Sequence, residues 1–171
     1  VNDTAWQRLY VFHIAGPSST QLVTSTEWSV YGFSDAADMA VEGNTLVVVG
    51  AKAHKFDISD PVNPRYVASS AQNLNANAVK IQGGYAYILD TNGADSKFFV
   101  VSLQNTTPTV VGTIGGMNSA AHLTVLDGRV AVLGNPFFVG QPLSIIDVKN
   151  PLNPVITMTS STVETSQAHG I

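Results

Sequence analysis

Short stretches of alternating apolar and polar residues recur along the chain in pairs. The pairs read MAVEGNTLVVVG, VKIQGGYAYILD and LTVLDGRVAVLG, over residues 39–50, 79–90 and 123–134. Alternation with a period of two is typical of a strand, and a Gly-Asn, Gly-Gly or Asp-Gly pair between two such runs is a strong β-hairpin signal. No apolar period of about 3.6 residues persists for three turns. The pattern therefore predicts an all-β chain with three hairpins and almost no helix.

A second motif follows each hairpin. It reads KFDISDPVNPRYV, FVVSLQNTTPTVV and SIIDVKNPLNPVIT, and a degenerate copy, YVFHIAGPSSTQLV, precedes the first hairpin. The polar residue in the strand is His13, Asp57, Ser102 or Asp147, at intervals of 44, 45 and 45 residues. An Asp here can accept hydrogen bonds from the backbone amides that follow it, and the prolines favour a turn. The sequence of each unit thus predicts four strands, joined in order by a tight turn, a loop and a Pro-rich turn.

Four strands in a repeat of this length predict a β-propeller blade. The copies resemble the LVIVD repeat, a bacterial and archaeal family of propeller blades. SIIDVKNPLNP and FDISDPVNP are similar to its strand-and-turn signature, and MAVEGNTLVVV and VKIQGGYAYIL are similar to its preceding hairpin. The resemblance covers nearly all of the chain after Leu9. It implies an all-β propeller of four-stranded antiparallel blades and no single activity.

The blade count has two solutions. The predicted repeats cover residues 1–34 (partial), 35–74, 75–117, 118–163 and 164–171 (the start of another blade). The chain is either a four-bladed ring, closed by pairing its last strand with the first partial blade, or an arc of a propeller with roughly six to eight blades. We favour the arc, because VNDTAW is a poor second strand for a closing blade. An arc leaves unpaired edges, so we expect a protein partner or a remaining propeller segment beside it.

Composition limits the class of function. Charged residues make up 12% of the chain, and 8 Lys and Arg against 12 Asp and Glu give a formal net charge of −4. This balance argues against nucleic acid and anionic lipid as main partners, and no apolar run approaches the roughly 18 residues of a spanning helix. The chain has no cysteine, which excludes disulfides and thiolate metal sites. That absence is compatible with an extracellular, periplasmic or cell-surface prokaryotic protein, which is the location we expect.

One repeat position provides a candidate metal site. His122 and His169 lie at or just before the start of an innermost strand, where the other blades carry Asp38 and Ala78. Innermost strands line the channel of a propeller, so Asp38, His122 and His169 can project toward one axis. Imidazole and carboxylate ligands suit copper, zinc or iron, although the same groups can equally face a wet channel as ordinary polar residues. Ala78 interrupts any ring of ligands.

Aromatic residues in loops provide a candidate interaction surface. Phe137 and Phe138 lie in NPFFVGQPL, and Trp28 and Tyr31 lie in TEWSVYGFSD. Such residues either pack on a neighbouring blade or, if exposed, contact a protein. We expect His54, in the loop AKAHK between two strands, to be exposed to solvent.

The motifs of common enzymes are missing from the sequence, which contains no GxSxG, GxGxxG or GxxxxGK. No catalytic residue can be nominated, and we lean against an enzyme. We expect a binding or scaffold propeller that presents loops and a channel to a protein or small-molecule ligand outside the cytoplasm. The alternative is a metal-dependent, copper-type oxidoreductase, or a subunit of one, with histidine ligands facing the channel.

Overall fold

The computed structural model describes residues 2–3, 8–16, 19–33, 35–90, 96–117, 120–134 and 143–160. An N-terminal sheet contains β1 (Asn2–Asp3), β2 (Arg8–Gly16) and β3 (Ser19–Glu27), and a short 3-10 helix, η1 (Trp28–Tyr31), follows it. The first blade contains β4 (Asp38–Glu42), β5 (Thr45–Val49), β6 (Ala53–Asp57) and β7 (Arg65–Ser69). The second contains β8 (Ala76–Gln82), β9 (Tyr85–Asp90), β10 (Phe98–Ser102) and β11 (Thr109–Ile114). The third contains β12 (Ala120–Leu126), β13 (Arg129–Gly134), β14 (Leu143–Asp147) and β15 (Val155–Ser160).

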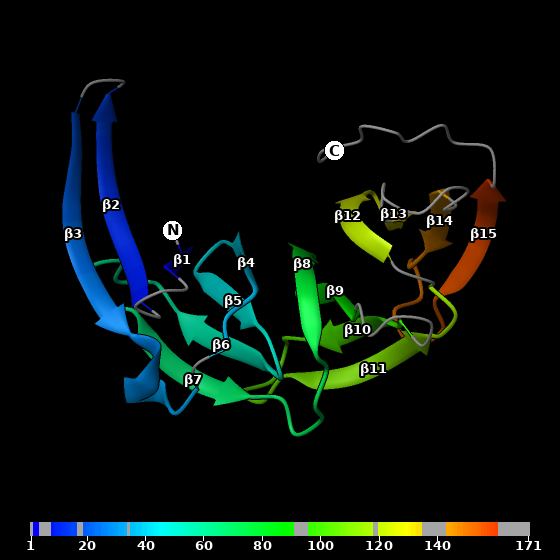
Figure 1. The fold of residues 1–171 in the computed structure, drawn as a ribbon, viewed down its shortest axis with the longest axis horizontal. Helices are drawn as coiled ribbons and strands as arrows, with labels where there is room; N and C mark the ends of the chain where they lie inside the picture. Colours follow the sequence, from blue (N-terminus) through cyan, green and yellow to red (C-terminus); the bar gives the residue numbers. More distant parts are fainter. Residues whose placement is uncertain are drawn as a thin grey trace.

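Each blade is an antiparallel sheet whose strands pair in chain order. The sheets stand side by side in an arc, with β4, β8 and β12 toward its inside and β7, β11 and β15 on its outside (Figure 1). This arrangement is that of a β-propeller, and the prediction of an all-β fold with four-stranded antiparallel blades is confirmed. In the part of the chain that the structure describes, no helix is long and apolar enough to cross a membrane.

The turns follow the local sequence. The predicted hairpins are β4–β5, β8–β9 and β12–β13. In the Asp127-Gly128 turn both residues have positive φ, 47° and 73°, as a two-residue turn matched to the twist of the strands requires. In the Pro-rich turns, the carboxylate of Asp57 accepts a hydrogen bond from the amide of Ser59 at 2.9 Å. Asp147 does the same for Lys149 at 2.9 Å, so the predicted capping of these turns is confirmed.

Hydrophobic cores lie between the sheets. Neighbouring residues on a strand point to opposite faces, and β5 is apolar on both faces because both are covered. Val47 and Val49 face the second blade, whereas Leu46 and Val48 face the N-terminal sheet. A similar core joins the second blade to the third, with Val100 and residues of β12 to β14 at its centre.

Polar side chains also join successive blades. The carboxylate of Glu42, the last residue of β4, accepts hydrogen bonds from the amides of Gly83 and Gly84 at 2.7 and 2.9 Å. Gln82, the last residue of β8, accepts a longer bond from the amide of Gly128 at 3.5 Å. The end of an innermost strand therefore holds the hairpin turn of the following blade.

Candidate functional site

The innermost strands place the predicted metal ligands at one structural position. Asp38, Ala78 and His122 pair with the equivalent residues of the neighbouring strands, Val49, Leu89 and Leu133. The repeat alignment thus located this position correctly on β4, β8 and β12. His169 lies outside the described residues.

Both carboxylate oxygens of Asp38 are engaged by the backbone. One accepts a hydrogen bond from the amide of Val79 at 2.9 Å, and the other accepts one from the amide of Met39 at 2.8 Å. Bonds from amides to a charged acceptor are strong, so Asp38 fastens β4 to β8. Within the described ranges, no three His, Cys, Asp or Glu side chains are grouped so that they could hold a metal ion. The three-residue site with His122 and His169 stays a prediction.

Trp28 belongs to a core and is not a surface residue. Its side chain is 0% exposed, and its ring packs on Phe33 and Phe56 at centroid distances of 5.2 and 6.0 Å. The helix η1 turns the chain back onto the first blade and brings this ring with it. Trp28 therefore offers no surface to a partner, and the alternative of packing on a neighbouring blade is the one observed.

Tyr31 joins the same aromatic cluster. Its ring meets the edge of Phe56 at 5.1 Å and stacks on Tyr66 at 5.8 Å, and its hydroxyl donates to the carbonyl of Pro64 at 3.3 Å. It is half-buried, so only part of the ring reaches solvent. Phe137 and Phe138 fall outside the described residues.

The expectation that His54 is exposed is wrong. His54 lies within β6, is 6% exposed, and stacks on Phe33 at a centroid distance of 3.7 Å. Its Nδ1 is buried without a hydrogen-bond partner among the described residues. Burial lowers the pKa of its imidazole to about 4. The repeat carried a signal for this, because it aligns His54 with Phe99 and Ser144, the first residues of the strand motifs FVVS and SIID. Both equivalents are buried in the structure.

Exposed apolar side chains gather on the outermost strand of the third blade. Val155, Ile156 and Met158 are 50%, 38% and 48% exposed, and Leu152 in the preceding turn is 68% exposed. These four residues are called the β15 strip. The apolar side chains of β7 and β11, the equivalent strands, are at least half-buried. The strip has no distinct signature in the sequence, because the three outer strands are apolar to a similar degree.

A second exposed group lies on the β2–β3 hairpin. Phe12, Ile14 and Leu22 are 41%, 72% and 50% exposed, and Phe12 pairs directly with Leu22 across the two strands. These three residues are called the hairpin patch. The strands that carry them extend beyond the other sheets (Figure 1).

The model of the LVIVD repeat family matches the chain twice, at residues 75–95 and 128–162. The chain therefore contains LVIVD repeats. The first match covers the β8–β9 hairpin of the second blade, and the second match covers β13 to β15 with the Pro-rich turn of the third blade. No curated protein matches the sequence.

Solved structures resemble this arc of blades. The crystal structure of the N-terminal domain of Nup159 aligns with a TM-score of 0.51 and 15% identity, over 87% of this chain and 36% of that one. A chain in the S. cerevisiae structure of Dbp5 bound to Nup159, Gle1, IP6 and ADP aligns with a TM-score of 0.52 and 14% identity, over 88% and 36%. At such identities the likeness shows the fold alone. The chain spans 36% of the length of each matched chain.

Proposed function

We propose that this arc of LVIVD blades is a non-catalytic binding or scaffold module whose partner is another protein. The β15 strip carries the proposal. Residues 155–159 are all exposed, on both faces of the strand, and three of the five have large apolar side chains. Covering a half-exposed Ile or Met removes enough apolar surface from water to contribute about 1 kcal/mol per side chain.

The strand that bears the strip has the properties of a covered edge. β15 is the last strand in the order of its sheet, and its sequence VITMTS contains no charge and no proline. Exposed edge strands usually carry Lys or Pro that discourages pairing with another chain, and β15 carries neither, although a bulge at Thr157 interrupts its pairing with β14. An uncharged apolar edge favours a protein surface of similar character and does not favour a polyanion.

The similar structures are consistent with a protein partner. In one of them, Dbp5 is bound to Nup159. The proposal extends to a location outside the cytoplasm, for which the cysteine-free composition is the support. Fractionation of the source cells would test that location directly.

Site-specific photocrosslinking tests the proposed function. A photoreactive residue at Ile156, introduced in the cells that make the protein, should give one discrete adduct with another polypeptide. Thr107, an exposed residue in a turn of the second blade, is the matched control position. Met158→Asp should abolish the Ile156 adduct without unfolding the protein, because this side chain is 48% exposed. Equal adduct patterns from Ile156 and Thr107 would show that the strip is not a binding surface.

The alternative, a copper-type oxidoreductase, makes a different prediction. It requires a stoichiometric metal on Asp38, His122 and His169, which native mass spectrometry of the protein as isolated would detect. His122→Ala should then remove both the metal and the activity. No observation on the described residues favours this alternative, because Asp38 already serves as a backbone anchor.

A further inference from the structure

The segment between β3 and β4 packs on the first blade. It begins with η1, and the structure describes its residues 28–33 and 35–37, which are called the η1 segment. After η1 these residues belong to no strand, so pairing within a sheet does not hold them in place. Side-chain packing and individual hydrogen bonds hold the segment instead. Segments of this kind open more readily than the strands that they cover.

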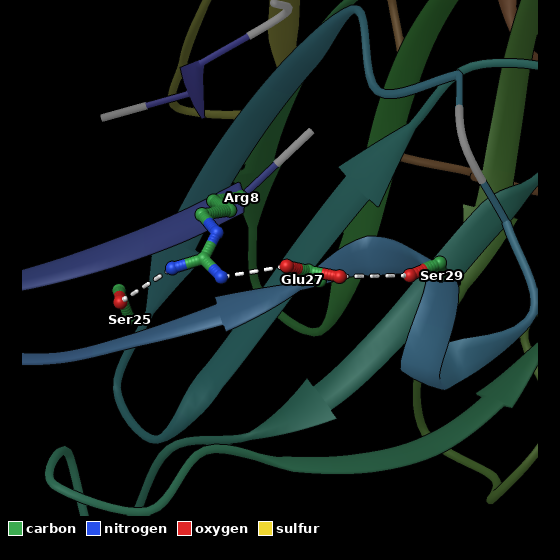
Figure 2. Close-up of polar contacts among 4 residues, drawn as sticks. All are labelled: Arg8, Ser25, Glu27 and Ser29. Carbon is green, nitrogen blue, oxygen red and sulfur yellow. Dashed lines mark hydrogen bonds and ion pairs between the residues drawn. The ribbon is translucent and has the colours of Figure 1, made fainter. Parts of the chain in front are cut away.

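A charged pair anchors the start of the η1 segment. Glu27, immediately before η1, accepts a hydrogen bond from Arg8 at 2.6 Å, and its other carboxylate oxygen accepts one from Ser29 at 3.5 Å (Figure 2). Arg8 also donates to the hydroxyl of Ser25 at 3.3 Å. The hydrogen bond and the charge of Arg8 lower the pKa of Glu27, so this carboxylate stays mostly ionised between pH 7 and 5. Acid in this range therefore leaves the anchor in place.

The end of the η1 segment is bonded to the first blade. The amide of Ala37 donates to the carbonyl of Val49 at 2.7 Å, and the carboxylate of Asp35 accepts a hydrogen bond from the amide of Ala51. Both bonds exist only while the segment lies on the blade. Hydrogen exchange at the amides of Ala37 and Ala51 therefore reports whether the segment is docked.

The middle of the η1 segment packs on His54. The imidazole stacks on Phe33 at a centroid distance of 3.7 Å, and Phe33 stacks in turn on Trp28, which is 0% exposed. The Nδ1 atom of His54 is buried and has no hydrogen-bond partner among the described residues. An imidazolium carries an N–H on both ring nitrogens, so protonation would leave a donor at Nδ1 without an acceptor inside an aromatic cluster.

Charged side chains on two elements act on the imidazole of His54. Asp35 in the η1 segment favours the protonated ring and Lys52 in the β5–β6 loop opposes it, but burial is the largest effect and lowers the pKa to about 4. The other titratable rings of the cluster are the phenols of Tyr31 and Tyr66, and phenols ionise only in alkaline solution. His54 is therefore the ring of this cluster on which acid acts between pH 7 and 5.

The joint between the first and second blades is built differently. Its core contains only apolar side chains among the described residues. Lys55 on β6 adds polar links, because its ammonium group donates to the carbonyls of Leu103 and Asn105 at 2.6 and 2.9 Å. No imidazole is buried in this joint, so its core offers no such site for a proton.

We propose that the η1 segment is a proton-sensitive latch, which lies closed on His54 at neutral pH and is released from the first blade when the imidazole is protonated. Phe33 then leaves His54, and the aromatic cluster opens to water from the end of the segment toward the Glu27 anchor. The second and third blades keep their fold. The latch involves neither the β15 strip nor a partner, so it goes beyond the proposed function.

Native-state hydrogen exchange at pH 7 and 5 tests the inference. An open state with the ordinary imidazole pKa of 6.5 and a closed state with a pKa of about 4 give about twentyfold more opening at pH 5 than at pH 7. Protection of the amides of Ala37 and Ala51, corrected for the intrinsic exchange rate at each pH, should fall by that factor. The amides of β9 and β10 should stay better protected at both pH values, because the latch opens without unfolding the second blade.

Variants assign the effect to the imidazole. In His54→Phe, protection of the two latch amides should be the same at pH 7 and 5, since a phenyl ring can stack on Phe33 and binds no proton. His13→Gln is the matched control, because it removes an exposed histidine and should leave the fall in protection unchanged. Phe33→Leu is the second variant. It keeps the imidazole but weakens its packing, so protection should be lower at pH 7 and should still fall at pH 5.

Equal protection of the latch amides and the amides of β9 and β10 would overturn the inference, because the segment would then open only when the whole chain unfolds. So would an unchanged protection of the latch amides between pH 7 and 5 in the wild type. An equal fall in wild type and His54→Phe would assign the effect to another group and would also refute the latch. A failure of the Ile156 crosslink would leave these readouts unchanged, so the two proposals fail separately.

Discussion

Lowering the pH from 7 to 5 should destabilise this propeller mainly through one side chain, His54. The imidazole is 6% exposed, stacked on Phe33, and has a buried Nδ1 without a partner among the described residues. Burial lowers its pKa from 6.5 to about 4, the nearby Asp35 carboxylate opposes this shift, and Lys52 adds to it. The folded protein therefore keeps the imidazole neutral at pH values where the unfolded chain binds a proton.

The sign and size follow from proton linkage. The unfolded state binds more protons between pH 6.5 and 4, so the free energy of unfolding is greatest above pH 6.5 and falls as the pH is lowered toward 4. One pKa unit corresponds to about 1.4 kcal/mol, which gives a total loss of roughly 3 kcal/mol, about 2 of it between pH 7 and 5. This is a large share of the 5–15 kcal/mol that is typical for a domain. Asp57 contributes little in this range, because its pKa is lowered from 3.8 to about 2.

Urea unfolding at pH 7, 6 and 5 provides the assay. His54→Phe should remove most of the pH dependence, and at pH 7 it should preserve stability because it replaces an unpaired polar group with the residue type found at Phe99, the equivalent position in the second blade. His13→Gln is the matched control, since it removes an exposed histidine and should leave the slope unchanged. If wild type and His54→Phe lose the same stability between pH 7 and 5, the buried neutral imidazole is not the cause.

Three further predictions concern the contacts between strands and blades. Gly112→Ala should lower the free energy of unfolding, measured in urea, by about 2 kcal/mol, because a Cβ there would lie 2.5 Å from the carbonyl oxygen of Pro151 in the third blade. Gly115→Ala is its control, because a Cβ at that position has nothing within 4 Å. Glu42→Ala should lower the free energy of unfolding by about 1–2 kcal/mol, since two turn amides of the second blade lose their acceptor; an unchanged urea midpoint would contradict this. The turn amide that the Asp57 carboxylate binds is the chief cause that lowers the pKa of this carboxyl to about 2. The charged carboxylate therefore stabilises the fold above pH 4, and this stabilisation is lost toward pH 2. Asp57→Asn should make the free energy of unfolding less dependent on pH in that range, as followed by circular dichroism.

The parts of the fold that local chemistry determines could be predicted from the sequence. The Asp127-Gly128 turn and the capping by Asp57 and Asp147 involve residues within a few positions of one another, and the repeat confirmed each pattern in several copies. The equivalence of Asp38 with His122 also followed from the repeat.

The parts that depend on a neighbouring sheet could not be predicted. Trp28 is buried because η1 folds back on the first blade, a contact that no local pattern in TEWSVYGFSD records. Phe12 and Phe56 occupy the same repeat position in similar strands, but β5 and the aromatic rings of η1 cover Phe56, whereas Phe12 is 41% exposed. His54 is the intermediate case, because AKAHK has the composition of a loop, whereas the repeat aligns His54 with Phe99 and Ser144, which lie in strands.

The links between blades also give the array a direction. The residue before each hairpin turn is Glu42, Gln82 or Leu126, and the first two bind the turn of the blade that follows. Leu126 is 69% exposed and has no polar group with which to do so. The blades are therefore not interchangeable. A synthetic array lengthened by copying the first or second blade would keep the hydrogen bond from the end of the innermost strand to the turn of the next blade. A blade added after the third would need Leu126→Gln to restore that hydrogen bond.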